Sequence, residues 1–227
     1  MFRVWNAVGV TTPPGLRERK KQATRDALRE AALRLALERG PDGVRVEDIA
    51  EAAGVSPRTY NNYFASREQA IVSAVTADRE ARVAAAVAAR APGDRLADAV
   101  TEAVVEQCTE TGERAREVLL LLTARASLRD VYLASTADIE APLAAVIAER
   151  LEDTGAQTSS RVLAASVAAA VRIALESWLR PAGPAEDAAS PGAPGLVVPS
   201  GALHDRLRAA LAPLAPAFDA AQRRVQP

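Results

Sequence analysis

Five side chains that could form hydrogen bonds to a partner are expected to project from one short segment in the N-terminal third of this 227-residue chain: Arg58, Thr59, Asn61, Asn62 and Tyr63. In the major groove of DNA an arginine can pair with guanine, an asparagine can pair with adenine, and a threonine methyl group can contact thymine. Ser56 lies just before them at the expected start of a short helix, where backbone N–H groups can hold a phosphate. The chemistry available here is recognition of nucleic acid.

A long helix and a short helix are expected ahead of these side chains. Apolar residues recur with helical spacing over 16–39, and Gly40 followed by Pro41 ends this first helix. The second helix is expected over 46–53, with Gly54 in the left-handed conformation at its C-terminal end. A positive φ is accessible to glycine, so a tight turn can follow directly.

Start signals place the next two helices. Ser56 as N-cap and Pro57 in the first turn predict a third helix over 57–64. Ser66 predicts the start of a fourth helix, expected to run unbroken over 67–90 and so to form a rod of about 36 Å. A long helix, two short helices and a glycine-containing turn between them match the helix-turn-helix pattern.

Basic charge is concentrated in the same region. Residues 1–67 have a net charge of +4, whereas residues 68–227 have a net charge of −5. Arg17, Lys20 and Lys21 lie together at the start of the first helix. Such a cluster can neutralise DNA phosphates and would make binding depend on salt concentration.

Composition favours an all-α fold. The chain has 52 alanines and only eight aromatic residues, so strong helix formers dominate and strand-forming aromatics are scarce. Residues 1–15 are expected to form a mobile arm, and residues 181–200, rich in proline and glycine, a flexible loop. The remaining helices are expected at about 94–109, 113–127, 129–152, 157–180 and 201–211.

Several functional classes are excluded by residue counts. One cysteine, Cys108, and one histidine, His204, cannot supply a disulfide or a cysteine–histidine metal cage. No nucleophile–base pair or glycine-rich phosphate loop is present, so neither an enzyme nor a bound cofactor is expected. No apolar run approaches 18 residues, which predicts a soluble, cytoplasmic protein without a membrane partner.

The segment RVEDIAEAAGVSPRTYNNYFASR, residues 45–67, closely resembles the DNA-binding signature of TetR-family transcriptional regulators. The resemblance covers about residues 16–76. It implies a homodimeric repressor that binds a palindromic double-stranded DNA operator through residues 16–66. It also implies that residues 67–227 bind a small-molecule effector and form the dimer.

The resemblance also assigns roles to single residues. Thr59, Tyr63 and Arg67 would contact phosphates or base edges, with Arg67 where the family usually has lysine. Arg45 stands where a threonine commonly caps the second helix; either that cap is missing or Arg45 contacts phosphate instead. With the residues identified above, the predicted DNA-contact set is Arg17, Lys20, Lys21, Arg45, Ser56, Arg58, Thr59, Asn61, Asn62, Tyr63 and Arg67.

Two apolar surfaces are candidates for the dimer contact. The helix over 157–180 is apolar over a wide arc, which predicts that it buries one side in its own domain and another against a second subunit. A leucine stripe from Leu203 to Phe218 could complete a bundle between subunits. The alternative is an ordinary core within one chain.

The effector site is predicted around the apolar segment 119–133. Arg125 and Tyr132 lie among leucines there, and an arginine in such surroundings could pair with a carboxylate or phosphate on an apolar ligand. The alternative for Arg125 is an ion pair with a nearby acidic residue. Cys108, Leu122 and Trp178 complete the candidate set. Similarity to a subfamily with acyl-coenzyme-A-like ligands favours an apolar or acyl-type effector.

A second class of function remains open. The chain could be a helical protein that binds small molecules without an operator. The polar third helix and the basic start of the first helix favour the DNA-binding regulator.

Overall fold

Every regular element in the described part of the chain is helical, as predicted. The computed structural model describes residues 15–91, 93–109, 113–152, 157–179 and 202–224. The expected N-terminal arm, apart from Gly15, and the expected loop at 181–200 lie outside these residues. The α-helices are α1 Leu16–Arg39, α2 Val46–Ala52, α3 Pro57–Tyr60, α4 Arg67–Val75, α5 Arg79–Ala88, α6 Leu96–Cys108, α7 Glu113–Ala124, α8 Ala126–Ala134, α9 Glu140–Arg150, α10 Gln157–Leu179, α11 Leu203–Leu211 and α12 Ala215–Arg223. Short 3₁₀ helices are η1 Pro41–Gly43, η2 Ser135–Ile139 and η3 Ala212–Leu214.

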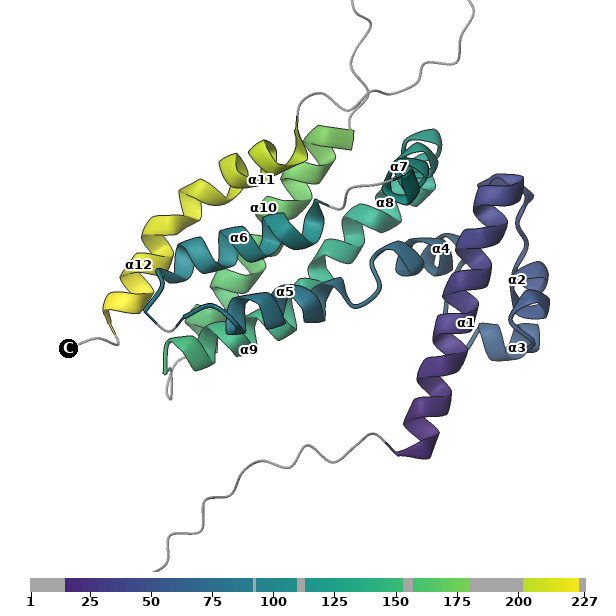
Figure 1. Ribbon diagram of the computed structural model, residues 1–227, viewed down its shortest axis with the longest axis horizontal. Helices are drawn as coiled ribbons and strands as arrows, with labels where there is room; N and C mark the ends of the chain where they lie inside the picture. The colour runs from purple at the N-terminus through teal and green to yellow at the C-terminus, as the bar shows by residue number, and fades with distance from the viewer. Residues whose placement is uncertain (1–14, 92, 110–112, 153–156, 180–201, 225–227) are drawn as a thin grey trace, which may run out of the picture.

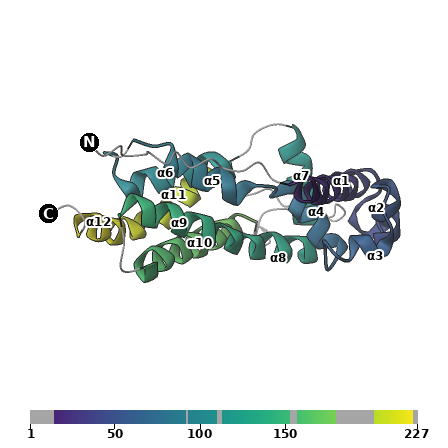
Figure 2. The ribbon, with the colours of Figure 1, turned by 90° about the horizontal axis from the view of Figure 1, so that it is seen from below.

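The molecule is elongated, with α1, α2 and α3 at one end and α12 at the other (Figures 1 and 2). Between them α5, α6, α9, α10 and α11 pack side by side, and α4 and α8 connect the two parts through their mutual contact. One continuous apolar core runs through both ends. Helices α1, α2 and α3 therefore form an N-terminal unit that extends from a larger helical body.

The turn between α2 and α3 forms as predicted from its glycine. Gly54 has a φ of +68°, its N–H donates to the carbonyl of Glu51, and the next N–H, of Val55, donates to Ala50. These two bonds are the pattern in which a left-handed residue satisfies the last carbonyls of a helix. The Oγ of Ser56 then accepts from the N–H of Thr59 and caps α3. The turn thus joins the two helices without leaving their ends unpaired.

The third helix is shorter than predicted. It ends at Tyr60 rather than at residue 64, and Asn61, Asn62 and Tyr63 lie in the turn that follows. Tyr60 itself is completely buried, and its hydroxyl donates to the carbonyl of Ser66 at 2.7 Å. Burial, with a smaller effect of Glu68, raises the pKa of Tyr60 to about 12. The last residue of α3 is thus hydrogen-bonded directly to the residue that caps α4.

The predicted unbroken helix over 67–90 is wrong. It divides into α4 and α5 at Thr76, Ala77 and Asp78, and Asp78 adopts the left-handed conformation with a φ of 54°. Aspartate tolerates this conformation better than most residues do. The guanidinium of Arg82 donates to the carbonyl of Ala77 at 2.7 Å and so satisfies a group at the break. A rigid rod over this segment is therefore absent.

The helical body buries one of the two predicted apolar surfaces and leaves part of the other exposed. Leu207, Leu211 and Phe218 are buried, and their helices pack against α6 and α10 of the same chain. The leucine stripe is thus an intramolecular core, and its predicted role between subunits is wrong. Helix α10 is buried on one side, whereas Val162 and Ile173 on its other side are 58% and 55% exposed.

Two segments are long and apolar enough to cross a membrane by composition alone, Ala126–Arg150 and Thr158–Leu179. The first is not one helix but the succession α8, η2 and α9. The second lies within α10, which packs against both α9 and α11. Packing within the helical body buries 28% of the apolar window in the first segment and 50% of that in the second.

Candidate nucleic-acid interface and cavity

Two basic and polar groups that are distant in sequence meet at the N-terminal end of the molecule. Arg17, Lys20 and Lys21 of α1 line the same hollow as Thr59, Asn62 and Tyr63 from α3 and its following turn. Glu18 and Thr24 complete its wall. Helix α1 brings its positive charge to this side because its C-terminal half packs into the core through Leu28, Leu35 and their neighbours.

The other predicted contact residues do not line this hollow: Arg45, Ser56, Arg58, Asn61 and Arg67. Arg58, Asn61 and Asn62 are exposed, so their polar groups are accessible to a partner. The hydroxyl of Thr59 lies 3.0 Å from Ser56 Oγ, which is the group that caps α3. Both hydroxyls therefore hold the start of the helix, and the structure gives Ser56 a positioning role in addition to the predicted phosphate contact.

Arg45 occupies the N-cap of α2, but its side chain makes no capping hydrogen bond. Asp48 instead accepts from the N–H of Arg45 at 3.1 Å. The side-chain cap that a threonine would supply at this position is therefore missing, and Asp48 makes only the reciprocal bond to the N-cap N–H, in the first turn where the helix dipole also favours negative charge. The Arg45 side chain is exposed.

Arg67 is engaged inside the protein. Its guanidinium donates to the carbonyl of Val44 at 2.9 Å and to the carboxylate of Glu68 at 2.9 Å. Burial alone would raise the pKa of Glu68, but the hydrogen bond and charge of Arg67 lower it below its usual value. These contacts fasten the start of α4 to the segment before α2. The predicted DNA contact of Arg67 is not supported by this arrangement.

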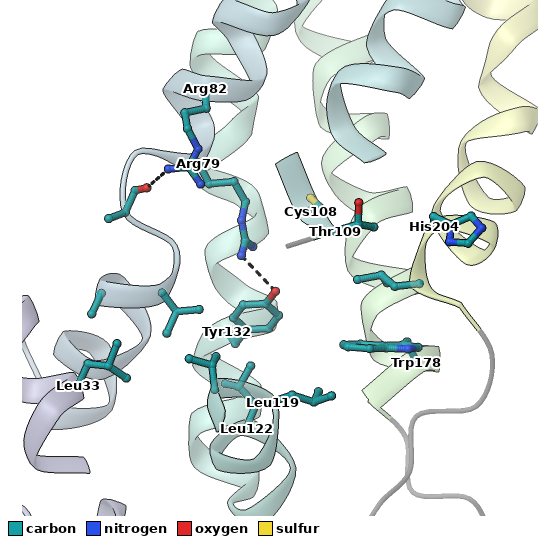
Figure 3. Close-up of a pocket in the computed structure, with 15 residues that line it drawn as sticks. Leu33, Arg79, Arg82, Cys108, Thr109, Leu119, Leu122, Tyr132, Trp178 and His204 are labelled. Atoms are coloured by element: carbon teal, nitrogen blue, oxygen red, sulfur yellow. Dashed lines mark hydrogen bonds between the residues drawn. The ribbon is translucent and has the colours of Figure 1, made fainter. Parts of the chain in front are cut away.

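A second site lies in the helical body, where a cavity of about 410 Å³ opens between helices (Figure 3). Four of the five predicted effector residues line it: Cys108, Leu122, Tyr132 and Trp178. The volume is within the range of roughly 300–1,000 Å³ typical of small-molecule sites. Its wall is completed by Leu33, Ala74, Val75, Ala77, Arg79, Arg82, Thr109, Val118, Leu119, Leu203 and His204.

Arg125 does not line this cavity, so its predicted place in the effector site is wrong. It is exposed, and its guanidinium donates to the carboxylate of Asp42 through Nε at 2.7 Å and also through Nη2. The alternative reading, an ion pair with an acidic residue, is confirmed. The hydrogen bond from Arg125 lowers the pKa of Asp42. Because Asp42 lies in η1, between α1 and α2, this pair joins the helical body to the N-terminal unit.

Two arginines of the cavity wall, Arg79 and Arg82, were not among the predicted residues. Arg79, the first residue of α5, is only 7% exposed, and its Nη2 donates to the Tyr132 hydroxyl at 3.2 Å. Its guanidinium also lies 5.2 Å from the centre of the Tyr132 ring. No sequence signal marks Arg79, because the helix break before it contains neither glycine nor proline.

No group of three or more potential metal ligands from histidine, cysteine, aspartate and glutamate occurs in the described part of the chain. The fold and the basic surface together define a helix-turn-helix protein with an additional helical body.

Comparison with known proteins identifies the N-terminal domain. Residues 28–74 match the family described as bacterial regulatory proteins, tetR family. The chain is 47% identical over 72 residues to the HTH-type transcriptional regulator TcmR from Streptomyces glaucescens, and 38% identical over 76 residues to the HTH-type transcriptional regulator BetI from Rhizobium meliloti. The N-terminal domain is thus a helix-turn-helix domain of the TetR family.

The sequence similarity to these two relatives covers a minor part of the chain. Each alignment covers 32% of the present chain, and 32% and 37% of the two relatives, so the chain matches about a third of their lengths. A crystal structure of a protein assigned to the TetR family from Rhodococcus sp. aligns over 87% of this chain and 99% of its own, with 21% identity and a TM-score of 0.46.

Proposed function

We propose that the protein is a transcriptional regulator that binds an operator as a homodimer and releases it when a small apolar or acyl-type effector enters the cavity. One observation carries the DNA-binding part: Arg17, Lys20 and Lys21 line one hollow with Thr59, Asn62 and Tyr63. Cationic side chains next to hydrogen-bonding ones are suited to hold phosphates and to read bases. In the same proposal the protein is a cytoplasmic repressor that the effector releases from DNA.

The proposed dimer uses the outer side of α10. Val162 and Ile173 are exposed there, and a groove beside them is formed by residues of α9 and α10 that include Ala141, Ala144 and Ala165. Small residues allow helices of two subunits to approach closely, and a two-fold axis would make the contact self-complementary. Two N-terminal units would then read two half-sites about 34–36 Å apart.

Helix α1 is the proposed connection between effector and DNA. Its start carries Lys20 and Lys21 at the hollow, and Leu33 further along the same helix lines the cavity. The 13 residues between Lys20 and Leu33 correspond to about 20 Å of unbroken helix. A ligand that displaces Leu33 can therefore tilt the basic end of α1. It can shift the equilibrium only as far as its affinity differs between the two arrangements.

The test is selection of duplexes from a random-sequence DNA library by the full-length protein, followed by titration of the enriched sequence. We expect an inverted repeat, bound by two chains. Replacing Lys20 and Lys21 by alanine should weaken binding to all duplexes and reduce the salt dependence. The matched control is Arg34→Ala on α1, which does not line the hollow and is ion-paired with Glu38. Failure to enrich any sequence would favour the alternative, a small-molecule-binding protein without an operator.

A further inference from the structure

The junction between the N-terminal unit and the helical body contains a carboxylate shared by two arginines. Asp42 in η1, shortly before α2, accepts two hydrogen bonds on one oxygen from the guanidinium of Arg125. Its other carboxylate oxygen lies 3.9 Å from Nη2 of Arg67, the first residue of α4. Nη1 of Arg67 also donates to the carbonyls of Asp42 and Val44. The segment before α2 is therefore held from two sides, by the start of α4 and by the helical body.

Arg125 occupies the corner between α7 and α8. Its backbone is extended there, α7 ends at the residue before it and α8 begins at the residue after it. Both helices line the cavity, through residues that include Leu122 and Tyr132. The Arg125 side chain thus connects the segment that forms the cavity wall with the segment that precedes the helix-turn-helix.

The exposure of this ion pair decides what it can do. The side chains of Arg125 and Asp42 are 50% and 58% exposed, and exposed ion pairs add little to the stability of a fold. Two donors of one planar guanidinium on a single oxygen nevertheless restrict the direction of the contact. Such a contact is suited to select one relative position of two parts that are already folded.

We propose that Arg125 is a positioning residue for operator recognition: through Asp42 it holds the helix-turn-helix at one position relative to the helical body. A dimer reads two half-sites only when its two recognition segments have the correct separation. A unit that is already held in position loses less freedom on binding, so the operator is bound more tightly. Non-specific binding depends mainly on phosphate charge and gains less. This inference rests on the proposed function, because it concerns an operator bound by a dimer.

The experiment compares the full-length protein with its variants by fluorescence anisotropy, on the selected operator and on random duplexes. Arg125→Gln should weaken operator binding by about threefold per subunit, hence by about tenfold for a dimer, and random-duplex binding by less than about twofold. Arg125→Lys should restore part of the operator affinity, because it keeps the charge but not the planar group. In an Asp42→Asn background, Arg125→Gln should have no further effect.

The matched control is Arg208→Gln. Arg208 forms the same kind of pair, with two hydrogen bonds to Glu102 and a similar exposure, but this pair joins α11 to α6 within the helical body. Its loss should leave both affinities unchanged. Equal weakening of operator and random-duplex binding by Arg125→Gln, or the same loss of operator affinity in Arg208→Gln, would overturn the proposal.

A second measurement needs no DNA and separates failure of this inference from failure of the proposed function. Hydrogen exchange of the α2 amides should be faster in Arg125→Gln than in the parent, whereas exchange in α9 should not change. Faster exchange in α2 with unchanged operator affinity would contradict the positioning role. If no sequence is enriched from the library, the proposed function fails and the exchange measurement decides this inference alone. Faster exchange in α2 would then support the positioning contact, and unchanged exchange would overturn it.

Discussion

The hollow beside α1 and α3 draws its side chains from one short part of the chain, whereas the cavity in the helical body draws them from distant helices. The hollow takes its side chains from residues 17–63, within one helix-turn-helix domain. The cavity takes its side chains from eight α-helices between Leu33 and His204, and its two arginines come from the helix that follows a break. A surface formed by a short, contiguous segment is accessible to sequence reasoning, whereas a cavity depends on how distant helices pack.

The largest effect is expected beneath the DNA-facing surface. Tyr60→Ala removes a completely buried ring and its hydrogen bond to Ser66, and should lower the free energy of unfolding by about 3–5 kcal/mol. Tyr60→Phe, which keeps the ring, should cost about 1 kcal/mol. Urea denaturation followed by circular dichroism measures both values. A loss below about 1 kcal/mol for Tyr60→Ala would show that the tyrosine does not anchor the end of α3.

The next effect separates base reading from phosphate contact. Arg58→Ala and Asn61→Ala should each cost about 1–3 kcal/mol at the selected operator while changing binding to random duplexes much less. The reason is that both side chains are exposed after the tight turn and can reach base edges. Fluorescence anisotropy on both kinds of duplex measures the difference. Equal losses on both would reassign these residues to phosphate contact.

Filling the cavity should break the second region alone. Ala74→Leu adds volume to the cavity wall. Octanoate, a probe of the acyl type proposed above, should bind about tenfold more weakly, which corresponds to about 1.4 kcal/mol. Operator affinity without ligand should stay within twofold of the parent, because the hollow shares no lining residue with this position. Trp178 fluorescence, in a Trp5→Phe background, and anisotropy provide the two measurements. Loss of operator binding with retained octanoate binding would contradict this prediction.

The smallest effect is expected at the contact between the two regions. Asp42 is exposed and its pKa is lowered by the hydrogen bond from Arg125, so its ionised form stabilises the folded state. This contribution should be fully present above the ordinary value of 3.8 and should disappear as the pH falls through the lower pKa of the folded state. Asp42→Asn should therefore be slightly less stable than the parent at pH 7. The two proteins should become equal in strongly acidic solution.

Paired urea denaturation curves at several pH values test this last prediction. Other exposed pairs, such as Arg95 with Asp219, titrate identically in both proteins and cancel in the difference. A stability difference that persists unchanged at acidic pH would show that Asp42 acts through something other than its charge.

The all-helical class, the starts of α1 to α4 and the polar residues of the helix-turn-helix domain could be predicted from the sequence alone. These features depend on local chemistry: Gly54 can adopt a positive φ, Ser56 and Ser66 can cap, and charged residues gather within a few turns. Cys108, Leu122, Tyr132 and Trp178 were also identified as cavity residues, because apolar segments are buried wherever the helices pack.

The break between α4 and α5 and the partners of the arginines could not be predicted, because they depend on tertiary packing. Asp78 breaks the fourth predicted helix although nothing in its neighbours signals a break, and the carbonyl left at that point is taken by Arg82. Which arginine lines the cavity also depends on contacts between distant segments. Arg79 donates to Tyr132 at the cavity wall, whereas Arg125 pairs with Asp42, 83 residues earlier in the chain. Charge and hydropathy are properties of a residue, but the partner that compensates a charge is set by packing between distant helices.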